Sequence, residues 1–210
     1  MQVTFHASKP MARFLKKRSG VELTRLPCDD PAVVGRVPLH SSPMHVAWQL
    51  HVIQTNRDHG DQVVLAMEAF SRYQIFIPVV WNMGMKEVEA ALMQRWLEEL
   101  LLLKAGNPYI GDDMTGTVLA QLLSRPPQPN WVTNTDLSIN GHLADTDQWI
   151  ASELQQKRCS ILREEHARDL AWYLNNQIKT VKHPEAGKLK IMPAEQMQLL
   201  GLVPAGLGHG

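Results

Sequence analysis

Apolar and polar residues alternate along several short stretches of the chain, and this pattern predicts strands. The clearest stretch covers residues 45–55, where Val46, Trp48, Leu50 and Val52 share one side and mostly polar residues occupy the other. The polar residues 56–61 then read as a hairpin loop. Further strands are predicted at residues 2–6, 62–67, 72–80 and 131–139, the last ending in a turn at Asn140-Gly141.

Helical spacing dominates the rest of the chain. Residues 88–103 carry apolar side chains three and four positions apart, which predicts an amphipathic helix. Ser8 is a suitable N-cap for a helix over residues 9–18, and Asp145 is a suitable N-cap for a later one. Additional helices are predicted around residues 118–122, along residues 162–178 and from Pro193 onwards.

These elements together predict an α+β fold. We expect an antiparallel sheet of four or five strands with one buried face, and helices packed on that face. Residues 1–155 are the expected core domain, and residues 156–210 are a helical extension that packs on the core and ends in a frayed tail. With 210 residues, 44% of them hydrophobic, the chain is able to bury a core of this size.

Charge is balanced over the whole chain but not along it. The 21 basic and 21 acidic residues cancel, so any attraction to nucleic acid has to come from a local patch. The helix predicted after Ser8 is such a patch, because it carries no acidic residue and five basic ones: Lys9, Arg13, Lys16, Lys17 and Arg18. These are candidates for contact with nucleic acid or with a protein. The alternative is an ordinary solvated helix, because no exposed aromatic residue, of the kind that single-strand binders use, is expected among these charges. The six tryptophans are mostly expected in the core.

Two arginines at strand ends suggest a polar pocket. Arg57 follows one predicted strand and Arg72 begins another. With Asn56 and Ser71 they could grip a phosphate or carboxylate, because a guanidinium binds such groups through two parallel hydrogen bonds. Four more polar residues would line this pocket: Thr133, Thr135, Asp136 and Ser138. The alternative is a structural network in which Arg72 pairs with Asp136.

Three segments carry a resemblance to a small, uncharacterised bacterial family, a domain of unknown function. The matching segments are Trp48 to Asn56-Arg57, Val63 to Ser71-Arg72-Tyr73, and Thr133-x-Thr135-Asp136-x-Ser138-x-x-Gly141-x-x-x-Asp145. The resemblance covers residues 45–110 and 131–155, and it departs at Ala7-Ser8-Lys9-Pro10, where relatives have a Thr-Lys-Lys type of strand end. It implies a shared unit over residues 45–155 and relatives on plasmids and mobile elements, but it supplies no catalytic residues.

Motifs for catalysis, cofactors and metal ions are missing from the sequence. There is no G-x-S-x-G, Walker lysine loop or H-E-x-x-H, so no cofactor is expected. Among nine histidines, His45 and His51 share a strand face but lie too far apart to hold one ion. The paired Asp112 and Asp113 are interpreted as a solvated turn before a helix, with cation binding as the alternative, so no metal site is expected.

Cysteine usage and the absence of targeting signals indicate the cellular compartment. The chain has only two cysteines, Cys28 and Cys159, and so few thiols in a chain of this size are typical of a reducing environment. The first thirty residues lack the apolar segment of a signal peptide, and the most apolar run, residues 100–103, is too short to cross a bilayer. We therefore expect a bacterial, cytoplasmic protein without membrane contact.

Two functions follow as hypotheses. The first is a non-catalytic interaction or regulatory module of a bacterium, linked to a mobile element, because no acid, base and nucleophile are assembled in the sequence. Its partner would be a protein or a nucleic acid that contacts the basic helix. The alternative is a small enzyme or sensor that binds a phosphorylated or anionic ligand through Arg57, Arg72 and Asp136.

Overall fold

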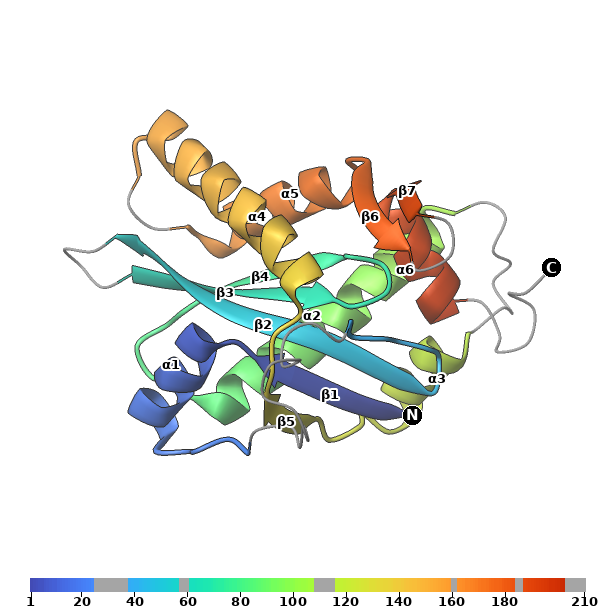
Figure 1. The fold of residues 1–210 in the computed structure, drawn as a ribbon, viewed down its shortest axis with the longest axis horizontal. Helices are drawn as coiled ribbons and strands as arrows, with labels where there is room; N and C mark the ends of the chain where they lie inside the picture. The colour runs from blue at the N-terminus through green and yellow to red at the C-terminus, as the bar shows by residue number, and fades with distance from the viewer. Residues whose placement is uncertain (25–37, 57–60, 108–115, 160–161, 184–186, 203–210) are drawn as a thin grey trace.

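The computed structural model describes residues 1–24, 38–56, 61–107, 116–159, 162–183 and 187–202 (Figure 1). The elements in chain order are β1 (Gln2–Ala7), α1 (Lys9–Ser19), β2 (His45–Asn56), β3 (Asp61–Glu68), β4 (Gln74–Pro78), α2 (Met85–Ala105), α3 (Thr117–Ser124), β5 (Asn130–Thr133), α4 (Leu137–Gln156), α5 (Glu164–Asn175), β6 (Lys179–His183), β7 (Gly187–Ile191) and α6 (Pro193–Leu202). The α+β class predicted from the sequence is confirmed.

The main sheet has five strands in the order β4-β3-β2-β1-β5. Strands β2, β3 and β4 form the predicted antiparallel meander. Strand β1, however, pairs parallel with both β2 and β5, so the sheet is mixed and the expectation of a purely antiparallel sheet is wrong. The reason is α1, which carries the chain back along the sheet between β1 and β2, so that both strands start at the same end.

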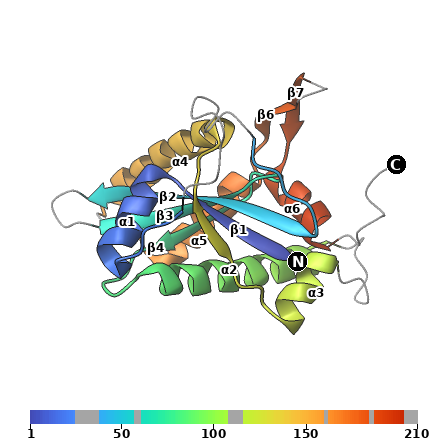
Figure 2. The same ribbon diagram turned by 60° about the horizontal axis from the view of Figure 1, so that its bottom comes forward.

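Both faces of this sheet are buried, whereas one buried face was predicted. The Trp48 face of β2 packs into a core with residues of α1, α2, α3 and α6. Ala47 and Ile53, on the opposite face, pack into a second core with residues of α4 and α5. Figure 2 shows α2 and α4 on opposite sides of the strands. The sequence pattern of β2 did not indicate this second core, because Ala47 and Ile53 share their face of the strand with the polar residues Gln49 and His51.

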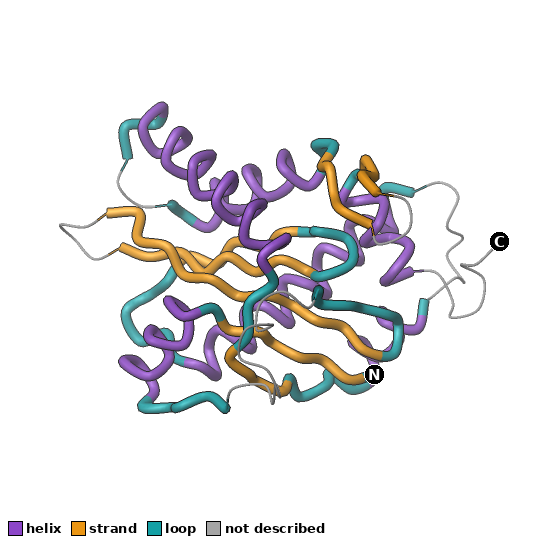
Figure 3. The backbone as a smooth tube through the Cα atoms, viewed as in Figure 1, coloured by secondary structure: helices purple, strands orange, loops and turns teal. Residues whose placement is uncertain are grey.

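The strand predicted over residues 131–139 is confirmed only for residues 131–133, and the turn predicted at Asn140-Gly141 lies within a helix. Strand β5 ends at Thr133, and α4 begins at Leu137 and continues through Asn140-Gly141 (Figure 3). Its N-cap is Asp136 rather than Asp145, because a carboxylate oxygen of Asp136 accepts the backbone N–H of Ser138 at 2.7 Å. Asp136 therefore acts as a helix cap and not as a strand residue.

The C-terminal part contains a hairpin that was not predicted. Helix α5 is shorter than the expected stripe, and Ile178 is 65% exposed beyond its end. The following strands β6 and β7 pair with each other in a separate two-stranded sheet. Helix α6, as predicted, starts at Pro193, and it packs so closely on α2 that a Cβ at Gly201 would lie 2.3 Å from the Leu100 side chain. The domain boundary near residue 155 stays a prediction.

The tryptophans divide into buried and exposed ones. Trp48 and Trp96 are fully buried and pack edge to face, with ring centroids 5.5 Å apart. Trp81, by contrast, is 86% exposed, and Trp149 and Trp172 are about half exposed. The expectation that the tryptophans mostly anchor the core is therefore wrong for these three. Within the described residues no helix has the length and apolarity needed to cross a membrane.

Candidate functional site

A groove runs along helix α1 at the surface of the protein. Side chains of α1, β2, β3 and the segment that follows β4 surround a volume of about 640 Å³. This volume lies within the range of pockets that hold small ligands. The lining includes Arg13, Lys17 and Arg18 of α1, and Trp81. We call it the basic groove.

The basic residues of helix α1 point in different directions around the helix axis. Ser8 caps the helix as predicted, and Met11, Phe14 and Leu15 face the core. Arg13 and Lys17 are one turn apart on the same side, which places both along the groove. Lys16 points to a different partner, since it forms an ion pair with Glu22.

The five predicted basic residues therefore do not act as one patch. Lys9 and Lys16 do not line the groove, whereas Arg13, Lys17 and Arg18 do. All five side chains are exposed. Within the part of the chain that the structure describes, Lys9, Arg13 and Lys17 have no hydrogen-bond or ion-pair partner.

The segment that carries Trp81 is fixed to the end of α1. An Arg18 guanidinium nitrogen donates to the backbone carbonyl of Trp81 at 2.6 Å, and the Ser19 hydroxyl accepts the backbone N–H of Met85 at 2.8 Å. Gly84 allows this close approach, because a Cβ at this position would lie 2.6 Å from the Ser19 hydroxyl and would displace it. The backbone at Trp81 is thus held in place while its indole stays in solvent.

The groove is positive although the chain as a whole is neutral. Three basic residues line it against one acidic residue, Asp61, while the formal net charge of the protein is zero. Arg18 also lies 5.8 Å from the ring centroid of Phe14, a cation–π distance that orients the guanidinium. Such an arrangement of fixed positive charge attracts anions at short range.

The polar pocket predicted around Arg72 is only partly described. Arg57 lies outside the described residues, and the side chain of Asn56 is not described either. Arg72 is 7% exposed and has a left-handed φ of 60°. Its guanidinium donates to the Ser138 hydroxyl at 3.0 Å and to the carbonyl of Ala69. Within the described residues its Nε has no acceptor.

Ser71 and Asp136 lie in the same region, but their side chains close a turn and cap a helix. Ser71 donates its hydroxyl to the buried carboxylate of Glu68 at 2.6 Å, which closes the turn between β3 and β4. The second carboxylate oxygen of Asp136 accepts the backbone N–H of Leu39 at 2.8 Å. Among the described residues no ion pair joins Arg72 to Asp136, and Ser138 bridges the two instead.

The two threonines predicted to line this pocket have no described contact with Arg72. Thr133 ends β5 and Thr135 follows in the connection to α4, and both are half-buried. Among the described contacts neither accepts a hydrogen bond from Arg72. The structure therefore brings together Ser71, Arg72, Asp136 and Ser138 of the predicted set.

Two residues that the sequence did not indicate lie near Arg72. Burial lowers the pKa of Lys179 to about 8, with Arg72 lowering it further and Asp145 opposing the change. Burial also lowers the pKa of His142 to about 4, and the positive charges of Lys179 and Arg72 contribute. His142 is one helical turn after Ser138, but Lys179 comes from β6, so no spacing in the sequence could link them.

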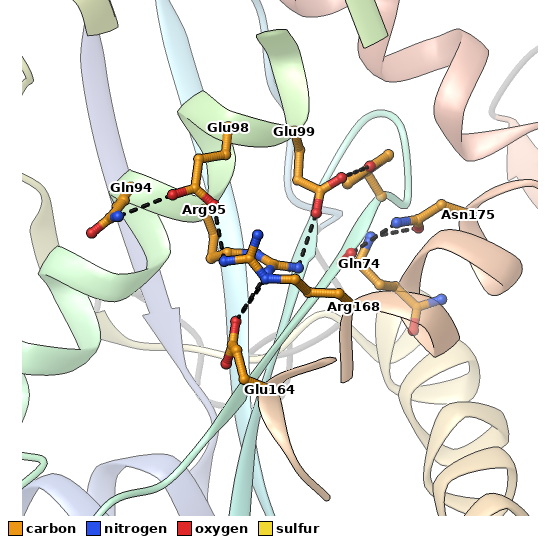
Figure 4. Close-up of polar contacts among 9 residues, drawn as sticks. Gln74, Gln94, Arg95, Glu98, Glu99, Glu164, Arg168 and Asn175 are labelled. Carbon is orange, nitrogen blue, oxygen red and sulfur yellow. Dashed lines mark hydrogen bonds and ion pairs between the residues drawn. The ribbon is translucent and has the colours of Figure 1, made fainter. Parts of the chain in front are cut away.

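A third polar cluster is closed and lies between α2, α5 and the edge of the sheet (Figure 4). Buried Arg95 donates to Glu99 at 3.0 Å and to Glu164 at 2.9 Å. Glu99 also accepts the hydroxyl of Tyr73 at 2.8 Å. Burial and the charge of Glu99 raise the pKa of Tyr73 above its usual range. These residues are held by one another, so we assign them a role in stability.

The same cluster protects the edge strand β4. The Asn175 side chain accepts the backbone N–H of Gln74 and donates to its carbonyl, both at 2.8 Å. This amide imitates a neighbouring strand, which prevents another chain from pairing at that point. The hydroxyl of Thr146 further donates to the Gln74 side chain.

Metal ligands do not cluster in the part of the chain that the structure describes, where no three residues of suitable type come together. His45 lies 3.1 Å from the Thr4 hydroxyl and His51 lies 3.0 Å from the Ser8 hydroxyl. Asp112 and Asp113 lie outside the described residues. The absence of a metal and of a cofactor stays a prediction.

No family model matches the chain, and no curated protein matches it. The resemblance to a bacterial family associated with mobile elements therefore stays a prediction, as does a cytoplasmic location.

Proposed function

We propose that this protein is a non-catalytic interaction module that binds nucleic acid through the basic groove. The observation that carries the proposal is the exposure of Arg13 and Lys17 without a described partner along a groove of about 640 Å³. Phosphate groups of a nucleic acid would supply the missing negative charges. No catalytic constellation is required for this activity.

Nucleic-acid binding by this groove has a characteristic salt dependence. Each phosphate that a basic side chain neutralises releases a bound counterion, so affinity falls as salt rises. Two or three such contacts predict a roughly tenfold loss of affinity for a single strand between about 50 and 200 mM salt. Because the protein has no net charge, other surfaces add little long-range attraction.

The competing explanation is that the basic residues only stabilise helix α1. Positive side chains in the last turn of a helix interact favourably with its dipole, and this applies to Lys16, Lys17 and Arg18. It does not apply to Arg13, which lies in the middle of the helix. Nor does it explain why Trp81 stays exposed beside them, since burial of an aromatic side chain of this size stabilises a fold by a few kcal/mol.

Two double variants with equal changes of charge test the proposal. Arg13→Glu/Lys17→Glu reverses charges in the groove, and Lys9→Glu/Lys16→Glu reverses charges on the same helix outside it. Binding of a fluorescein-labelled oligothymidylate is measured by anisotropy over a range of salt concentrations. We expect the groove variant to lose at least about tenfold in affinity and to flatten the salt dependence, while the control variant loses much less.

Equal losses in the two variants would assign the binding to the general charge of α1 and contradict a role for the groove. Unchanged binding in the groove variant would exclude this surface altogether. Circular dichroism of both variants checks that α1 is still folded.

A second candidate function rests on the region around Arg72. A buried guanidinium nitrogen without a described acceptor and a partly buried Lys179 with a lowered pKa favour an anionic ligand there. Asp136, which was predicted as a ligand contact, is occupied with the cap of α4, so Lys179 takes its place in this proposal. Arg57 is not needed for it.

Thermal unfolding in the presence of inorganic phosphate tests this second candidate. A ligand at a hundred times its dissociation constant stabilises a protein by about 2.7 kcal/mol. We expect phosphate to raise the melting temperature of the wild type and to have less effect on Lys179→Met. An equal rise in both proteins would show that phosphate acts elsewhere.

A further inference from the structure

Trp81 differs from the other exposed tryptophans in its surroundings. Trp149 is partly covered by Tyr173, with ring centroids 5.7 Å apart, and Trp172 is 48% exposed on helix α5. Trp81 is 86% exposed and lines the basic groove. It is therefore the indole with the largest open surface in the protein, and it stands next to positive charge.

The hydrogen bond from Arg18 to the backbone of Trp81 holds the backbone of residue 81 next to the positive charge of Arg18. The guanidinium of Arg18 donates to the carbonyl of residue 81 and not to its side chain, so the indole remains accessible while the position of its backbone is set. A platform that is positioned before a ligand arrives loses less freedom on binding. Val80, which is also exposed, extends the apolar surface beside it.

Paired and unpaired nucleic acids use such a platform differently. In a duplex the faces of the bases are covered by their neighbours, and only phosphates and base edges reach a protein. In a single strand a base can leave the stack and lie flat on an aromatic side chain, while its phosphates contact basic residues. The combination of Trp81 with Arg13 and Lys17 suits the second case.

We infer that the basic groove binds single-stranded nucleic acid, with an unpaired base stacked on Trp81 and the adjacent phosphates against Arg13 and Lys17. This inference rests on the proposed function and names its substrate class. The stacking is tolerant of sequence, because every base has an aromatic face. The groove, with a volume of about 640 Å³, has room for a short segment of the strand.

The test compares three labelled probes on the full chain. They are an oligothymidylate of about 12 nucleotides, the matching oligouridylate, and the oligothymidylate annealed to its complement. We expect at least one single strand to bind at least about tenfold more tightly than the duplex. Trp81→Ala is expected to weaken single-strand binding by roughly 5- to 100-fold and to leave duplex binding unchanged, since stacking on one aromatic contributes an affinity of this order.

Three further measurements sharpen the test. Trp172→Ala removes another exposed indole outside the groove and should leave all affinities unchanged. Trp81→Phe keeps an aromatic face and should retain part of the single-strand affinity. Tryptophan fluorescence should be quenched by the single strand in the wild type and much less in Trp81→Ala.

Several results would overturn the inference and leave the proposed function standing. These are a duplex bound as tightly as the more tightly bound of the two single strands, polyphosphate competing as well as an unlabelled single strand, or an unchanged ratio of affinities in Trp81→Ala. If no probe binds in a way that depends on Arg13 and Lys17, the proposed function itself fails, and the inference fails with it.

Discussion

The basic groove and the buried cluster of Figure 4 use the same kinds of residue for opposite purposes. In the buried cluster Arg95 contacts two carboxylates, and Asn175 meets both backbone groups of Gln74. In the groove Arg13 and Lys17 point into solvent and have no partner among the described residues. Polar side chains that are held by their neighbours stabilise the fold, and those without partners are available to a ligand.

Arg95→Ala should have the largest effect on stability, because it leaves Glu99 buried without its positive partner. Removing one member of a buried pair costs about 3–5 kcal/mol, which corresponds to a fall of roughly 10 °C in the melting temperature of a chain of this length. Thermal unfolding followed by circular dichroism measures it. The control is Arg168→Ala, which removes the exposed end of the same cluster and should cost about 1 kcal/mol or less. Equal effects would contradict a stabilising role that depends on burial.

Asn175→Ala should follow, because it exposes the edge of strand β4. Two hydrogen bonds to the buried backbone of Gln74 are lost, which we expect to cost about 3 kcal/mol in the free energy of unfolding. The neighbouring Asn176→Ala removes an amide whose bond to the Trp172 carbonyl is exposed, and it should cost less than about 1 kcal/mol. Urea unfolding of both variants measures the difference, and light scattering checks whether the open edge promotes association. An Asn175→Ala variant as stable as Asn176→Ala would show that the edge needs no cover.

His6 should make the protein sensitive to acid. Burial lowers its pKa from 6.5 to about 4, with His45 adding to the effect and Asp136 opposing it. The neutral form is therefore favoured in the folded state, so the stabilisation is present above the unfolded pKa and is lost as pH falls from 6.5 towards 4. Between pH 7 and pH 5 we expect a loss of about 2 kcal/mol from this residue.

The His6→Gln variant isolates this contribution. It should flatten the dependence of the unfolding free energy on pH in that window, although His142, whose pKa is also lowered to about 4, leaves part of the dependence in place. A variant with the same acid sensitivity as the wild type would exclude His6 as its source.

The smallest effect on stability is expected in the groove itself. Arg13→Ala and Lys17→Ala should each change the free energy of unfolding by less than about 0.5 kcal/mol, since they remove exposed side chains without described partners. Their effect should appear in nucleic-acid binding instead. A large loss of stability in either variant would show that these residues stabilise the fold, as the buried cluster does, and would contradict the difference between the two regions.

Local patterns identified most of the elements but not all of their boundaries. Helix α1 was predicted over residues 9–18 with its cap at Ser8, and it spans Lys9–Ser19, because a capping signal acts within a few residues of the helix start. Asp136 and Asp145 both fit the pattern of an N-cap, and the packing of Ile139 and Leu143 against the sheet favours the first. The same local signals do not set the direction of β1, which was wrongly expected to be antiparallel to its neighbours.

The candidate site was accessible to sequence reasoning only in part. The five basic residues of α1 were identified from their charge, but their division into groove and non-groove positions was not. Trp81 was expected in the core like Trp48, because each follows apolar neighbours in the sequence and composition does not distinguish them. Lys179 and His142 were not connected with Arg72, since they come from distant segments of the chain.

The sequence by itself determined the α+β class, the cap and length of α1, the apolar face of β2 and the presence of a basic helix in a neutral chain. These features depend on contacts between near neighbours, which a linear pattern records. Tertiary structure decided which strands run parallel, which arginine is buried and which tryptophan remains in solvent. Those outcomes depend on pairings between residues far apart in the chain, and such pairings exist only once the elements have packed.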